Sequence, residues 1–203
     1  MALTLVTAAA GEPLTLDDVK GHLKITSTDQ DGEIVGWITA AREWAETRTG
    51  RALITQTWDL KLDGFPVDGG PITVPKPPLI SVTSITYVDT NGVTQTWSSA
   101  LYTVDAPTGP QARSGQIWPA YNESYPGTRA QVNAVTVRFV CGYGAVADLV
   151  PASIRSAMKI LIATWNAPGR QSVNVGSGAT VVEIPDTVDL LVSGFQDYVG
   201  ATY

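Results

Sequence analysis

The sequence predicts an α+β fold: a small bundle of N-terminal and C-terminal helices that carries an antiparallel, β-rich insertion. Near both ends of the chain, apolar residues recur every three or four positions, which is typical of amphipathic helices. In the middle third they alternate with polar residues between Gly, Pro and Asn turns, which is typical of half-buried strands. We therefore expect residues 1–51 and 145–203 to form one bundle, with residues 52–144 inserted between its two halves.

Two helices are expected before the insertion. The first begins after Thr15, whose hydroxyl suits a helix N-cap, and ends near Lys24. The second covers residues 31–49, where a stripe of Ile and Ala recurs at helical spacing. A polar cluster at residues 27–31 is expected to cap its start, and Gly50 suits its C-terminal end.

The insertion is expected to contain short strands joined by tight turns. Asp89-Thr90-Asn91-Gly92 predicts a hairpin, and Pro75-Lys76-Pro77-Pro78 predicts an extended link that cannot lie inside a sheet. The strands are expected at residues 54–62, 72–74, 80–88, 93–97, 101–104, 116–118 and 132–141.

Two further helices are expected after the insertion. Pro151 suits the first position of a helix that Pro168-Gly169 would stop. Residues 167–180, rich in Gly, Ser and Asn, are expected to form a mobile loop. A last helix is expected from Pro185 onward, because apolar residues up to Val199 are spaced for one face.

The residue inventory argues against catalysis and against tight binding of nucleic acid. The formal net charge is −6, whereas a protein that grips phosphates needs a basic face; DNA could still slide past. One Cys (Cys141) and one His (His22) cannot make a disulfide or a zinc site within this chain, and no phosphate-binding loop is present. A hydrolase would have to use carboxylates such as Asp63, Asp68 or Asp105, which lie in turn-like segments. We expect no enzyme activity, no cofactor and no metal.

The N-terminus lacks the basic region of a signal peptide, and no run of apolar residues is long enough to span a membrane.

Aromatic residues in the second half of the insertion are the candidate contact residues: Trp97, Trp118 and Tyr121. Exposed aromatic rings anchor protein interfaces, and they also stack on sugars. Contact with a neighbouring subunit or another protein, and carbohydrate binding, therefore both remain open.

Six blocks in one order resemble the phage head–tail connector, or adaptor, family. They are LTLDDVKGHLKI, EWAETRTGRALITQTWDLKLDGFP, ITVPKPPLISVTSITYVDTNG, VTVRFVCGYG, VPASIRSAMKILIATW and IPDTVDLLV. The resemblance implies a structural virion protein at the head–tail junction, made in the host cytoplasm, that forms a ring, typically of twelve copies, beneath the portal.

The resemblance also implies partners and contact residues. The portal protein would lie on one side and a tail-side stopper or terminator on the other, with double-stranded DNA passing through unbound by sequence. In such proteins the C-terminal segment, here residues 180–203, often reaches toward the portal. Candidate portal contacts are therefore Val181, Val182, Ile184, Leu191, Phe195 and Tyr198. The chain departs from many relatives at residues 166–170, which lack their charged tract, so the contacts of this loop stay open.

Overall fold

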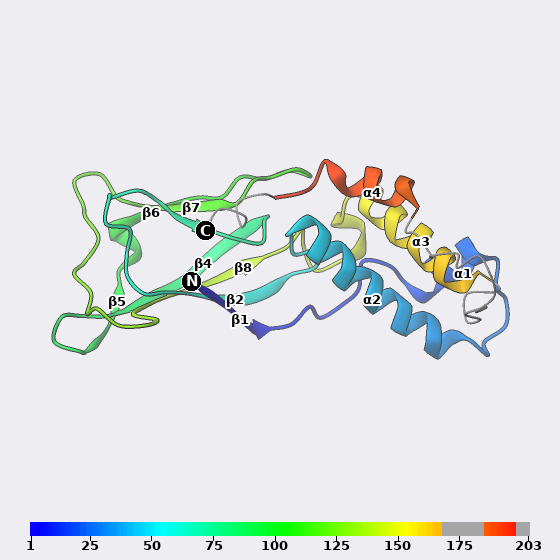
Figure 1. The fold of residues 1–203 in the computed structure, drawn as a ribbon, viewed down its shortest axis with the longest axis horizontal. Coiled ribbons are helices and arrows are strands. Elements are labelled where there is room, and N and C mark those ends of the chain that lie inside the picture. The colour runs from blue at the N-terminus through cyan, green and yellow to red at the C-terminus, as the bar shows by residue number, and fades with distance from the viewer. Residues whose placement is uncertain (168–184, 198–203) are drawn as a thin grey trace, which may run out of the picture.

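The computed structural model describes residues 1–167 and 185–197, and it has helices at one end and sheets at the other (Figure 1). The described helices are α1 (Leu16–Leu23), α2 (Asp31–Thr49), α3 (Ala152–Asn166) and α4 (Asp186–Ser193). Helices from both ends of the chain pack on one another, because α3 contacts α1, α2 and α4. Their shared core contains Val19, Ile34, Ile38, Leu53, Ile154, Met158, Leu161, Val188 and Val192.

Two antiparallel sheets form the other end. The larger has the order β1-β2-β8-β4-β5, and the smaller has the order β3-β7-β6. The strands of the larger sheet are β1 (Ala2–Thr7), β2 (Gln56–Leu62), β8 (Val135–Cys141), β4 (Leu79–Val88) and β5 (Thr94–Trp97). Those of the smaller sheet are β3 (Ile72–Val74), β7 (Gly115–Pro119) and β6 (Tyr102–Asp105). The described residues also form two short 3-10 helices, η1 (Ser99–Leu101) and η2 (Ala147–Leu149).

A second apolar core lies between the sheets. Leu60, Ile85, Ile117, Val137 and Phe139 are fully buried there, because alternate residues of each strand face inward. This arrangement confirms the predicted α+β class with antiparallel strands. The division into residues 1–51, 52–144 and 145–203 remains our proposal.

The helix signals in the sequence were accurate for α1 and α2. Thr15 accepts a hydrogen bond from the Asp18 backbone N–H, and the Asp18 carboxylate accepts one from the Thr15 backbone N–H, which forms a capping box. Helix α2 has the predicted bounds, and Gly50 closes it in the left-handed conformation (φ 73°).

Three local predictions need correction. The polar cluster before α2 does not cap it, because Ser27 and Asp29 bond to each other and the capping residue, Gln30, makes no side-chain bond to the helix. Pro151 precedes α3 rather than starting it, and its carbonyl accepts from the next turn. Helix α4 ends at Ser193, so Phe195 lies beyond it.

Strand β1 was not predicted. All six of its residues are exposed, so the alternation of burial that identifies a strand is missing, and only its pairing with β2 defines it.

Candidate interaction surfaces

The described part of the chain shows no cluster of metal-binding side chains. No group of three or more His, Cys, Asp or Glu residues there could hold a metal ion. Cys141 is fully buried, and burial raises the pKa of its thiol to about 12, so the thiolate nucleophile is scarce at neutral pH.

The candidate hydrolase carboxylates serve local structure. Asp63 accepts from the Asn133 backbone N–H, and Asp68 accepts from the Gly70 backbone N–H. Asp105 pairs with Arg113 on the surface. Such bonds are typical of carboxylates that stabilise turns and loops, and not of a pair of catalytic acids.

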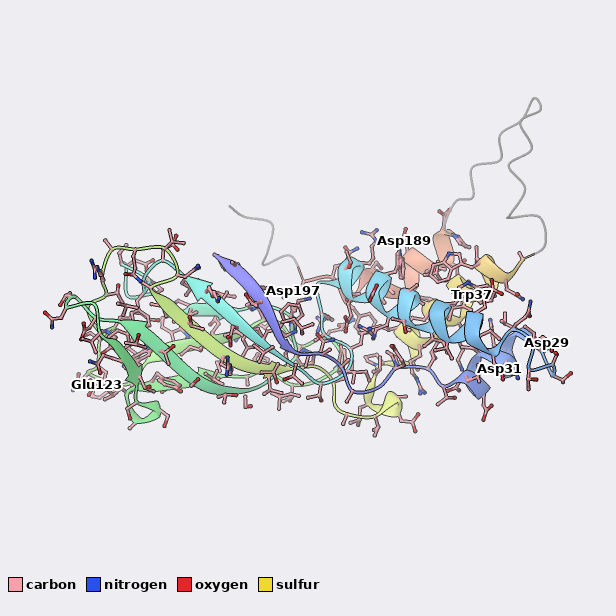
Figure 2. All side chains as sticks on the ribbon, turned by 90° about the horizontal axis from the view of Figure 1, so that it is seen from below. Asp29, Asp31, Trp37, Glu123, Asp189 and Asp197 are labelled. Carbon is pink, nitrogen blue, oxygen red and sulfur yellow. The ribbon has the colours of Figure 1, made fainter. Side chains whose placement is uncertain are left out.

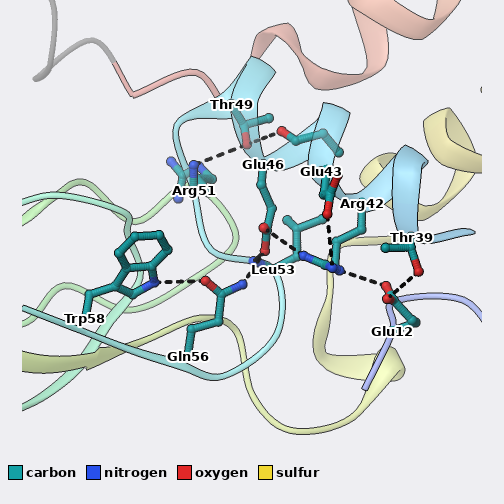
Figure 3. Close-up of polar contacts among 11 residues, drawn as sticks. Glu12, Thr39, Arg42, Glu43, Glu46, Thr49, Arg51, Leu53, Gln56 and Trp58 are labelled. Carbon is teal, nitrogen blue, oxygen red and sulfur yellow. Dashed lines mark hydrogen bonds and ion pairs between the residues drawn. The ribbon is translucent and has the colours of Figure 1, made fainter. Parts of the chain in front are cut away.

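A polar network joins the helices to the larger sheet, and Glu46 of α2 lies at its centre (Figure 3). Its carboxylate accepts from the Leu53 backbone N–H at 2.9 Å, from Gln56 Nε2 at 2.7 Å and from Arg42 Nη1 at 3.1 Å. Gln56, the first residue of β2, in turn accepts from Trp58 Nε1 at 2.9 Å. The last turns of α2 are thereby bonded to the start of β2.

The same network reaches the segment between β1 and α1. Arg42 Nε donates to Glu12 at 2.8 Å, and the Thr39 hydroxyl also donates to Glu12. Burial alone would lower the pKa of Arg42, but the hydrogen bond and charge of Glu12 and the charges of Glu46 and Glu43 raise it. The guanidinium therefore stays charged although it is largely covered.

A second set of bonds holds the residues after α4 against the junction. The Asp197 backbone N–H donates to the Thr49 carbonyl at 2.9 Å, and the Ser114 hydroxyl donates to the Asp197 carboxylate. Arg51, which is 3% exposed, donates from Nε to the Phe195 carbonyl at 2.5 Å. Asp197 lies between the strands and the helices in Figure 2. Residues 195–197 are thus fastened to the region where helix meets sheet.

An apolar groove opens on the surface at this junction. Its volume is about 580 Å³, and its walls come from the start of β4, the end of β8, the loop before Pro110 and the turn η2. Ile80 and Leu149 line it and are 48% and 55% exposed. No local sequence pattern predicts this groove, because its walls come from four separate segments.

The predicted aromatic contacts separate into two kinds. Trp97 is 4% exposed and packs against Phe65, Tyr102 and Tyr125, so its ring lies in the core rather than on the surface. Trp118 and Tyr121 are 42% and 92% exposed, and both are free to contact another molecule.

The predicted portal contacts lie only partly within the described residues. Leu191 and Phe195 pack against the helical core, Phe195 with 7% of its surface exposed. Val181, Val182, Ile184 and Tyr198 lie outside the described residues, as does the predicted loop apart from residue 167.

Comparison with known proteins shows what the chain is similar to. Residues 13–106 match the family model of phage gp6-like head-tail connector proteins. The match confirms, over residues 13–106, the resemblance to head–tail connector proteins that the sequence indicated. No curated protein matches the chain.

Solved structures with the same fold come from gene transfer agent (GTA) particles. A chain from the neck of an empty GTA particle, computed with C6 symmetry, has a TM-score of 0.75 at 23% identity. A chain from the virion of a native GTA particle has a TM-score of 0.74, and one from the native neck computed with C12 symmetry has 0.72, both at 23% identity. Each match covers 97% of this chain and 96% of the other, so the whole fold is shared.

None of the helices in the described residues is long and apolar enough to span a bilayer.

Proposed function

We propose that this chain is a structural subunit of the neck of a tailed-phage-like particle, where a ring of copies joins the portal to the tail. The observation that carries the proposal is the family match over residues 13–106, together with a fold shared with neck chains over almost its full length. Those neck structures were computed with sixfold or twelvefold symmetry, which supports a ring, and twelve copies are the number that we propose.

The subunit is built as a rigid connector. Its helical end and its sheet end have separate cores, and the Glu46 and Arg42 bonds fasten one to the other. Such a body can bind one partner at each end while the ends keep a fixed distance. We propose the portal protein and a tail-side stopper or terminator as these partners.

No chemical step is part of the proposed role. The buried Cys141, the turn-forming carboxylates and the net charge of −6 all fit a scaffold past which double-stranded DNA moves without being held. The C-terminal residues 180–203 are the proposed portal contact, on the strength of the family resemblance, and within them Phe195 is buried in the helical core, so its side chain is not part of the proposed contact.

Deleting the gene for this chain tests the role. We expect DNA-filled heads and free tails that do not join, seen by electron microscopy of the lysate, and recovery of joined particles when the chain is supplied in trans. Joined, tailed particles in the deletion strain would overturn the proposal.

A second candidate function is binding of carbohydrate or protein as part of a tail, which the exposed Trp118 and Tyr121 favour. It predicts glycan binding by the purified chain that is lost in Trp118→Ala and kept in Trp97→Phe. No binding on a glycan array would remove the carbohydrate version.

A further inference from the structure

Strand β1 presents an open, apolar edge. It pairs with β2 on one side, and no strand of the described residues pairs with its other side. Leu3, Leu5 and Val6 are 36%, 46% and 43% exposed, and residues 1–11 contain no charged side chain. An uncovered edge without charge, proline or cover invites pairing with another strand, and proteins normally block it.

The opposite side of the same sheet has a second open edge. Strand β5 pairs only with Ile85–Val88, so the first part of β4, residues 79–84, has β8 on one side and no described strand on the other. Ile80, Ser81 and Thr83 are exposed there, and this stretch also lacks charged side chains.

The two open edges lie at the same level along the strand direction of the sheet. Following the pairing across the strands, Thr4 faces Asp59, Asp59 faces Arg138, and Arg138 faces Ser84. The three pairings are all antiparallel, so β1 runs opposite to β4. Figure 2 shows the larger sheet with β1 along one of its sides.

We propose that β1 of one copy adds to the open edge of β4 in the next copy, so that the sheet continues from subunit to subunit around a ring. A rotation about an axis roughly along the strands preserves strand direction, so the two edges would meet antiparallel. Because the two edges lie at the same level along the strand direction, the rotation from one copy to the next needs no translation along its axis. An interface between two different surfaces, repeated without such a translation, closes into a ring rather than a filament. This inference rests on the ring in the proposed function.

Charge favours a second copy as the occupant. Each chain carries a formal net charge of −6, so copies repel one another unless they meet through uncharged surfaces. Neither edge carries a charged side chain, and the apolar groove beside Ile80 extends the β4 edge toward the helices. The register of the β4–β8 pairing shifts between Leu79 and Ser81 and between Val82 and Ser84, so we expect the pairing between copies to extend over only a few residues.

Disulfide trapping in assembled particles tests the pairing. The variant Thr4→Cys/Ser84→Cys places thiols on facing positions of adjacent strands, within the reach of a disulfide, and the native Cys141 is buried. The control Thr4→Cys/Thr47→Cys moves the second thiol to an exposed position on α2. After mild oxidation we expect non-reducing gels to show a ladder of cross-linked chains, with about tenfold more cross-linked chain than in the control.

Charge substitution provides a second readout that needs no disulfide. Circular dichroism first checks that Thr4→Lys and Thr47→Lys fold as the parent does. We expect Thr4→Lys to lower the amount of chain in purified particles by about tenfold, because a charge on the edge blocks pairing, while Thr47→Lys leaves it unchanged.

The outcomes separate this inference from the function on which it rests. If mass spectrometry finds the double-cysteine chain in particles and no ladder rises above the control, the β1–β4 pairing is wrong and the connector role stands. Normal incorporation of Thr4→Lys would likewise overturn the pairing and leave the connector role intact. Absence of the wild-type chain from particles overturns both.

Discussion

Replacing Glu46 by Gln removes one charge from the junction between α2 and β2 while keeping the size of the side chain. The Glu46 side chain is 11% exposed, and its two oxygens accept three hydrogen bonds. One oxygen serves both Leu53 N–H and Gln56 Nε2, and the other serves Arg42 Nη1.

The amide of Gln can satisfy only part of this set. Its oxygen would keep the bonds from Leu53 and Gln56, which leaves its NH₂ group facing the Arg42 guanidinium, donor against donor. The variant loses a charge-assisted bond and leaves a donor unsatisfied in a largely covered place. We expect the free energy of unfolding to fall by about 2–3 kcal/mol.

The control is Glu43→Gln, which makes the same chemical change beside the same arginine. The Glu43 side chain is 68% exposed and its oxygen is 4.0 Å from Arg42 Nη2, so the cost should stay below about 0.5 kcal/mol. Urea unfolding followed by circular dichroism measures both values. Equal effects of the two substitutions would refute the claim that Glu46 fastens the helices to the sheet.

Three further predictions concern backbone, ionisation and reactivity. Gly142→Ala would bring Cβ to 2.6 Å from the Ile54 carbonyl oxygen at φ +122°, so thermal unfolding should show a free energy of unfolding lower by about 2–4 kcal/mol. Gly36→Ala in α2, where the added Cβ meets nothing within 4 Å, should raise the free energy of unfolding by about 0.5–1 kcal/mol. Equal changes in the two variants would contradict this. The Thr15 hydrogen bonds lower the pKa of Asp18 from 3.8 to about 2, so its stabilisation is present above pH 3.8 and lost as pH falls through about 2. Asp18→Asn should cost about 1 kcal/mol at pH 7, and a difference that is as large at pH 2 as at pH 7 would argue against the cause. Cys141 should react with iodoacetamide at pH 8 only after denaturation, because burial raises its pKa to about 12; rapid labelling of the folded chain, read by mass spectrometry, would contradict that burial.

The parts of the fold that the sequence predicted are those with a local signal. Helix α2 has a regular apolar stripe and Gly50 after it, and its bounds are as predicted. Strand β1 has no buried face, so no alternation of burial could have identified it. The only local indication of a strand is the alternation of apolar and polar residues at Leu3, Thr4 and Leu5.

The contact residues were harder to predict because exposure depends on tertiary structure. Trp97 and Trp118 look alike in the sequence, yet Trp97 lies opposite the inward-facing Ile85, while Trp118 follows the inward-facing Ile117 and so faces outward. The bonds from Arg51 to Phe195 and from Asp197 to Thr49 join residues almost 150 positions apart in the sequence, and no local pattern predicts them.

We propose that this chain forms the ring between portal and tail. A cryo-electron microscopy map of the portal vertex of purified particles tests it most directly. We expect a ring of twelve copies beneath the portal, into which the helices and sheets of this chain fit without rearrangement. A neck whose density fits other chains only, in particles that lack this one, would contradict it.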